Sequence, residues 1–139
     1  MMIVEALPLK PGLRVLEIGC GPGALAREIA HRIGDGHVLA IDRSAKAIAL
    51  ARAGARAEIA AGRLGVRQIA IEDLELEPGE ARYDIALAVR VGALDGRHPE
   101  LEREALRRIA SALTPRGRFF IDGDGGDPLR EVRIPRSRA

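Results

Sequence analysis

A chain of 139 residues with 47% hydrophobic side chains is long enough for one folded domain, so we expect a single domain over residues 1–139. Only 2% of the side chains are aromatic and the formal net charge is +2, which argues against stacking platforms or a broad basic footprint for nucleic acids. The single cysteine, Cys20, excludes an internal disulfide, and with no signal peptide or membrane span in the sequence we expect a cytoplasmic protein.

Strand and helix signals alternate along the chain, which is typical of a parallel sheet covered by helices. Hydrophobic runs predict strands at residues 14–18, 38–41, 66–71, 83–89 and 118–121. Helical periodicity predicts a helix over 24–33, a second after Ser44 with a buried stripe that reaches Ile59, and a third from Pro99 to a stop at 115–117. The connection 74–82 is expected to hold at most one helical turn.

Five strands joined by right-handed crossovers predict a doubly wound, mostly parallel, Rossmann-like α/β sheet with strand order 3-2-1-4-5. The apolar residues at 129, 132 and 134 predict one further short strand, and therefore a reduced C-terminal hairpin. In such sheets ligands bind beyond the carboxyl ends of the strands, where the strand order reverses. That place lies here between the first and fourth strands.

The segment 15–23, Val-Leu-Glu-Ile-Gly-Cys-Gly-Pro-Gly, predicts a buried strand that enters a glycine-rich turn with a helix directly after it. Gly19, Gly21 and Gly23 allow the backbone to turn tightly and to approach a ligand where a Cβ would clash. A helix that starts after such a turn directs free N–H groups and its positive dipole end toward the ligand. An acid, Glu17, stands just before the first glycine.

The same glycine spacing also fits the dinucleotide fingerprint, because Ala24 occupies the position of its last small residue. Three features count against an NAD(P)-binding domain. A carboxylate at Glu17 fits badly beside phosphates, Gly-Pro-Gly is unusual in a dinucleotide turn, and the chain is too short for a dinucleotide domain plus a substrate domain. NAD(P) binding therefore stays the less favoured alternative.

Residues 10–23 resemble the lead-in and motif I of class I S-adenosylmethionine-dependent methyltransferases, and the resemblance extends over about residues 10–123. The chain resembles a small, truncated member of that family, of the type 11 and type 25 kind. The resemblance implies S-adenosyl-L-methionine as the cofactor. It also implies that the backbone of Gly19, Cys20, Gly21 and Gly23 contacts the methionine part, and that Glu17 helps to anchor the amino end through water or the turn. Cys20 is expected to pack rather than to react.

Asp42 follows the second predicted strand. A carboxylate there can accept hydrogen bonds from both ribose hydroxyls, although NAD sites use the same device. The simpler alternative is a cap ahead of Ser44. The resemblance further implies that Arg43 lines the adenine side of the cofactor site.

Residues 72–74, Glu-Asp-Leu, resemble the acidic motif that follows the third strand of the family. By that resemblance Asp73 hydrogen-bonds the adenine amino group, and the backbone N–H of Leu74 meets a ring nitrogen. The alternative is that both acids are solvated loop residues. At the end of the fourth strand, Val89 and Arg90 correspond to the place where a backbone carbonyl faces the cofactor amine.

The acceptor side is far less informative, and no catalytic residue is assigned. The Asn/Asp-Pro-Pro-Tyr and Pro-Cys signatures of base-modifying methyltransferases are absent. The polar residues expected near the methyl group are Arg90, Asp95, Arg97, His98, Asp122 and Asp124. His98 is either a general base or an exposed residue at the start of a helix. Residues 122–127 match a calcium loop poorly, so no metal site is expected.

Methyl transfer from a sulfonium requires mainly in-line positioning, so the lack of an acid–base pair does not argue against activity. We therefore expect methyl transfer to an unidentified small-molecule acceptor. The alternative is a catalytically silent cofactor-binding subunit that needs a partner protein. Because few residues follow the fifth strand, we also expect an exposed sheet edge that a homodimer or a partner protein covers. Neither a nucleic acid nor a membrane is expected as a partner.

Overall fold

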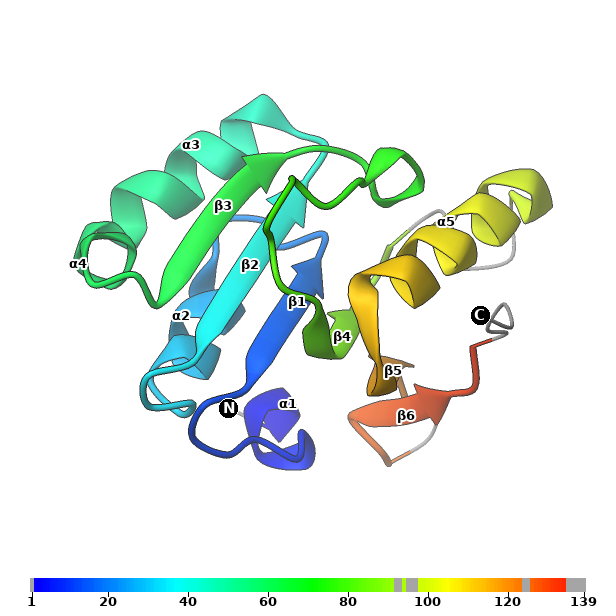
Figure 1. Cartoon of the computed structure of the whole chain (residues 1–139), viewed down its shortest axis with the longest axis horizontal. Coiled ribbons are helices and arrows are strands. Elements are labelled where there is room, and N and C mark those ends of the chain that lie inside the picture. The colour runs from blue at the N-terminus through cyan, green and yellow to red at the C-terminus, as the bar shows by residue number, and fades with distance from the viewer. Residues whose placement is uncertain (1, 92–93, 95–97, 124–125, 135–139) are drawn as a thin grey trace.

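The computed structural model describes residues 2–91, 94, 98–123 and 126–134. Its strands form one six-stranded sheet of order β3-β2-β1-β4-β5-β6, with helices against both faces (Figure 1). The strands are β1 (Arg14–Ile18), β2 (His37–Asp42), β3 (Leu64–Gln68), β4 (Tyr83–Ala88), β5 (Leu113–Asp122) and β6 (Leu129–Val132). The pairs from β3 to β5 are parallel, and β6 runs antiparallel to β5. The predicted order 3-2-1-4-5 and the short C-terminal hairpin are confirmed.

Alternation of side chains along the strands builds two cores, one on each face of the sheet. The helices are α1 (Met2–Ala6), α2 (Ala24–Ala30), α3 (Ala45–Gly54), α4 (Arg56–Ala60) and α5 (Pro99–Ala112), and a 3-10 turn, η1, spans Ile71–Asp73. Val15 of β1 packs into the core beneath α1, α2 and α3, whereas its neighbour Leu16 packs into the core beneath α5 and η1. In Figure 1, α5 stands apart from α2, α3 and α4 accordingly.

The parallel register brings the carboxyl ends of three strands to one edge of the sheet. Ile18 of β1 lies opposite Ile41 of β2 on one side and Ala88 of β4 on the other. The segments that follow these three residues must therefore meet above β1. This is the point where the strand order reverses, and where the sequence predicts a ligand.

The third strand lies earlier in the chain than predicted. It was expected over 66–71, but β3 ends at Gln68, which lies opposite Asp42, the last residue of β2. The Ile69 N–H still donates to the Asp42 carbonyl at 2.9 Å, and beyond it β2 offers no partner. Ile71 therefore leaves the ladder and enters η1, where its side chain packs in the core beneath α5.

Two predicted helices are also shorter than expected. The first ends at Ala30 rather than at residue 33, although Ile33 is still buried. The second breaks at Ala55, which has φ −121° and ψ 28°, so that α4 is a separate short helix. Ala55 is itself buried, so a stripe of apolar residues gives no sign of the break. On α4, the buried carboxylate of Glu58 accepts a hydrogen bond from His31 Nε2 at 2.9 Å.

The fifth strand starts earlier than predicted, directly after α5. Leu113 pairs with Tyr83, the register then shifts, and regular pairing resumes between Arg118 and Ile85. The expected stop at residues 115–117 is thus an irregularity inside β5. Among the described residues, no helix combines the length and the apolar character that crossing a membrane requires.

Candidate cofactor site

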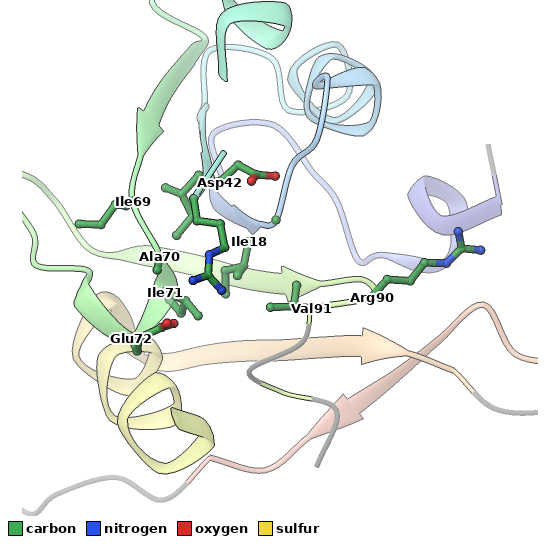
Figure 2. Close-up of a pocket in the computed structure, with 11 residues that line it drawn as sticks. Ile18, Asp42, Ile69, Ala70, Ile71, Glu72, Arg90 and Val91 are labelled. Carbon is green, nitrogen blue, oxygen red and sulfur yellow. The ribbon is translucent and has the colours of Figure 1, made fainter. Parts of the chain in front are cut away.

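A pocket of about 200 Å³ opens where the carboxyl ends of β1, β2 and β4 meet (Figure 2). The residues that line it are Ile18, Gly19, Ile41, Asp42, Arg43, Ile69, Ala70, Ile71, Glu72, Arg90 and Val91. Four of these, Gly19, Asp42, Arg43 and Arg90, are residues that the sequence singles out. The structure therefore gathers the ends of four separate segments around one cavity.

The walls of the pocket combine apolar side chains with polar groups in nearly equal proportion. Ile18 and Ile41 close one part of it, and Ile69, Ala70 and Ile71 close another. Apolar surface together with placed polar groups is typical of a small-molecule site. These apolar residues escape sequence reasoning because isoleucines at the ends of buried strands cannot be told from core residues.

The glycine turn stands against the pocket in a conformation that only glycine adopts easily. Gly19 has φ +72°, and a Cβ on it would lie 2.9 Å from the Cγ2 atom of Val91. Gly23 has φ +89°, and its Cβ would lie 3.0 Å from the Cβ of Ala51 on α3. Gly19 thus keeps space open against the segment after β4, and Gly23 allows α2 and α3 to pack closely.

Hydrogen bonds inside the protein fix this turn. The N–H groups of Gly19 and Cys20 both donate to the Ile41 carbonyl, at 2.8 and 2.9 Å, and the Gly21 N–H donates to Asp42 Oδ2 at 2.9 Å. These three donors already have partners, so a ligand at the turn must use other groups. The turn is therefore shaped before any ligand binds.

Asp42 connects the glycine turn to the start of α3. Its Oδ2 accepts from Gly21, and its Oδ1 accepts from the Ser44 N–H at 2.9 Å. Ser44 in turn caps α3, because its Oγ accepts from the Ala47 N–H at 3.1 Å. The capping role considered from the sequence is thus present. Each carboxylate oxygen accepts only one of these bonds and so retains a further lone pair, and Asp42 lines the pocket.

Glu17 is a buried acid behind the turn. The residue is 5% exposed, and its Oε1 has no hydrogen-bond partner among the described residues. Burial, and secondarily the nearby carboxylate of Asp42, raises its pKa from 4.5 to about 8. At neutral pH the Glu17 carboxyl therefore holds its proton in most molecules.

Cys20 is a packing residue. Its thiol is buried in the core beneath α2 and donates to the Gly21 carbonyl, with 3.4 Å between Sγ and the oxygen. Burial, and then the negative charges of Glu17 and Asp42, raises its pKa to about 12. A thiol that stays protonated is a poor nucleophile, in agreement with the structural role expected from the sequence.

In the acidic segment after β3, the structure places Glu72 rather than its neighbour Asp73 at the pocket. Glu72 lines the pocket, whereas Asp73 is exposed and does not. The Leu74 N–H, expected to meet an adenine nitrogen, donates to the Ile71 carbonyl at 3.1 Å, and the Leu74 side chain is buried. This placement follows from η1, whose tight turn brings Glu72 to the pocket and uses the Leu74 N–H internally. No sequence signal distinguishes the two neighbouring acids.

At the end of β4 the structure separates two neighbouring residues. Val89 is partly buried against the core beneath α2 and does not line the pocket, whereas Arg90 does. Arg90 has φ +59°, and its N–H donates to Asp122 Oδ1 at 2.8 Å. Figure 2 shows its side chain extending away from the part of the pocket formed by Ile69 and Glu72.

Of the remaining polar residues expected near a methyl group, the structure describes His98 and Asp122. His98 stands at the N-cap position of α5, exposed, and its side chain makes no capping hydrogen bond. Asp95, Arg97 and Asp124 lie outside the described residues.

Comparison with known families finds a match to a methyltransferase domain over residues 15–117. Among curated proteins, the chain is similar to a protein-L-isoaspartate O-methyltransferase of Methylorubrum populi, with 36% identity over 116 residues. That alignment covers 84% of this chain and 50% of the relative. The chain thus spans about half the length of this relative.

Solved structures show the same fold. The magnesium protoporphyrin IX methyltransferase of Synechocystis PCC 6803, with bound S-adenosylmethionine, is 24% identical with a TM-score of 0.62, over 80% of this chain and 49% of that one. The YcgJ protein of Bacillus subtilis is 23% identical with a TM-score of 0.68, and the match covers 86% of this chain and 47% of that one. A [4+2]-cyclase, SpnF, is 25% identical with a TM-score of 0.70, and the match covers 89% of this chain and 45% of that one.

Proposed function

Because the chain belongs to the class I S-adenosylmethionine-dependent methyltransferase family, we propose that its pocket binds S-adenosylmethionine and that it transfers the methyl group to a small-molecule acceptor. One observation carries this proposal: the glycine turn, the acid at the end of β2 and a pocket with both apolar and polar walls meet above β1. S-adenosylmethionine supplies an activated methyl group on a sulfonium, so the chain need only bind and orient.

The residues that surround the pocket fit the adenosine half of this cofactor. Ile18 and Ile41 offer apolar surface to a flat base, and Asp42 keeps lone pairs for the ribose hydroxyls. Glu72 is the acid available to the adenine amino group, in the role that the sequence assigns to Asp73. Arg43 closes the same side of the pocket.

The glycine turn and Glu17 fit the methionine half. The space above Gly19 would be lost to a Cβ, and the orphaned Oε1 of Glu17 lies buried behind the turn. A carboxyl group without a partner is costly to bury unless a cation or donor reaches it, directly or through water. The amino group of the cofactor is such a partner, and the carbonyl groups at the end of β4, at Val89 and Arg90, can accept from it as well.

The methyl acceptor is proposed only as a class, a small molecule. A cofactor-binding but catalytically silent subunit, active with a partner protein, is the second candidate. The fold alone does not decide against it, because a structure with the same fold is named as a [4+2]-cyclase rather than as a methyltransferase. Within the described residues, the cavity identifies neither an acid–base pair nor a nucleophile that would decide between them.

A second copy of the chain, or a partner protein, is proposed to cover β6. In the part of the sheet that the structure describes, β6 is the outermost strand on its side, and an edge strand presents unpaired N–H and C=O groups. A cytoplasmic location is also proposed, and the free, buried thiol of Cys20 is compatible with a reducing compartment. Sedimentation that shows a strict monomer at high concentration, with no co-purifying protein, would contradict the covered edge.

Calorimetric titration tests the cofactor. We expect micromolar binding of S-adenosylmethionine and of its product S-adenosylhomocysteine, and no heat with NAD. Binding of NAD instead would overturn the assignment of the pocket. If the folded protein binds neither methionine-derived compound, the site is not a cofactor site in the isolated chain. Binding followed by a screen of acceptors with radiolabelled cofactor then separates the enzyme from the silent subunit.

A further inference from the structure

Arg90 has a backbone conformation that an ordinary surface arginine does not need. It is the one residue other than glycine with positive φ among the described residues, at +59°. Only a few per cent of such residues adopt this left-handed conformation, and glycine or asparagine does so at lower cost. Strain of this kind persists where surrounding contacts impose it, and it is concentrated at ligand sites.

Asp122 supplies a contact to the backbone of Arg90. Ala88, the last residue of β4, lies opposite Ile121 of β5, so Arg90, just beyond the end of β4, comes close to Asp122, the last residue of β5. The Asp122 Oδ1 accepts the Arg90 N–H at 2.8 Å. The carboxylate thereby holds the backbone of Arg90, and Asp122 is a positioning residue.

Within the described part of the chain, no acid forms an ion pair with the guanidinium group of Arg90. Among the described residues, no ion pair or hydrogen bond of the Arg90 side chain is present, and the residue is exposed. It lies at the rim of the cofactor pocket and extends away from the side where Glu72 stands (Figure 2). The guanidinium group, unpaired among the described residues, thus extends from the rim on the side away from Glu72, and it starts from a strained backbone.

We propose that Arg90 recognises a carboxylate at the methyl-transfer end of the site. A planar guanidinium fork matches a carboxylate with two parallel hydrogen bonds, a geometry that a lysine ammonium cannot supply. The inference rests on the proposed function, in which Glu17 faces the amino end of the cofactor. The carboxylate belongs either to the methionine part of the cofactor or to the acceptor, and the two sources make different predictions.

The test compares two ligands that differ in the amino acid moiety. S-adenosylhomocysteine carries the α-carboxylate, and 5′-methylthioadenosine lacks it together with the amino group. Arg90→Asn removes the charge, and asparagine tolerates the left-handed backbone, so thermal unfolding should show a melting temperature no lower than that of the wild type. Arg90→Lys keeps a charge without the fork. Arg56→Gln is the matched control. Arg56 is exposed on α4, which leads into the amino end of β3, whereas the pocket lies at the carboxyl ends of the strands.

If the carboxylate is the cofactor's, Arg90→Asn binds S-adenosylhomocysteine about 10- to 100-fold more weakly, whereas its affinity for methylthioadenosine is unchanged. Arg90→Lys recovers part of the loss, and Arg56→Gln binds like the wild type. If the carboxylate is the acceptor's, both affinities are unchanged, and acetate binds to the wild-type complex with S-adenosylhomocysteine but not to the Arg90→Asn complex. Wild-type behaviour of Arg90→Asn in all three titrations would overturn the proposal. Failure of the wild type itself to bind S-adenosylhomocysteine would instead contradict the proposed function.

Discussion

Replacing the buried acid Glu17 by glutamine should stabilise the folded chain, and increasingly so as the pH rises. The Glu17 carboxyl has a pKa of about 8 in the folded state against 4.5 ordinarily, because it is buried and lies near Asp42. Each pKa unit corresponds to about 1.4 kcal/mol, so at pH 7 the acid lowers the free energy of unfolding by roughly 3 kcal/mol. At pH 8 and above, the loss approaches roughly 5 kcal/mol.

The sign follows from the direction of the pKa change. Below pH 4.5 the carboxyl is protonated in both states, and Glu17 costs nothing through its charge. Between 4.5 and 8 the unfolded chain releases the proton that the folded chain keeps, so the wild type loses stability as the pH rises through this window. Glutamine has no proton to release, and its contribution is independent of pH.

Urea unfolding of the wild type and of Glu17→Gln, followed by circular dichroism at pH 5, 6, 7 and 8, measures this difference. The advantage of the variant should increase by roughly 3 kcal/mol or more from pH 5 to pH 8. Glu58→Gln is a matched control of opposite sign. Hydrogen bonds from its own backbone and from His31 lower the pKa of Glu58, so its removal should destabilise most at neutral pH and least in acid. An advantage of Glu17→Gln that stays constant over the four pH values would refute the reasoning.

Three further predictions follow from the same site. Glu17→Gln should weaken binding of S-adenosylmethionine more at pH 8 than at pH 6, measured by calorimetry, because only the ionised acid attracts the ammonium group; an equal loss at both pH values would exclude that contact. Gly23→Ala should lower the free energy of unfolding by about 2–4 kcal/mol, since it combines positive φ with a 3.0 Å contact to Ala51, whereas Gly21→Ala, with open space at its Cβ, should cost about 1–2 kcal/mol. Equal melting temperatures for these two variants would show that the contact is not tight. Glu72→Ala should weaken S-adenosylhomocysteine binding about tenfold while Asp73→Ala leaves it unchanged, and the reverse order would restore the assignment made from the sequence.

The glycine turn and the acid at the end of β2 could be predicted from the sequence, because both depend on local chemistry. Gly19, Gly21 and Gly23 all have positive φ, and a chain that must adopt that conformation three times in five residues requires glycine. The strand before them and the acid after β2 follow from hydrophobic runs and their ends. For the same reason the order of the strands could be predicted, because parallel strands joined by right-handed crossovers allow few arrangements.

The placement of Glu72 and Arg90 depends instead on residues that are distant from them in the sequence. The end of β3 is set by the last residue of β2, and that end decides whether Glu72 or Asp73 faces the pocket. The conformation of Arg90 depends on Asp122, a neighbour only in the folded sheet. No local pattern contains this information.

The sequence by itself determined the sheet order, the glycine turn and the family, since each depends on residue types at short spacing. Only the tertiary structure decided which side chains meet the pocket and what charge they carry there. The pKa of Glu17 is the clearest case, because an acid after a buried strand is ordinary in the sequence. Its proton is retained only because folding removes water from the carboxyl and places Asp42 beside it.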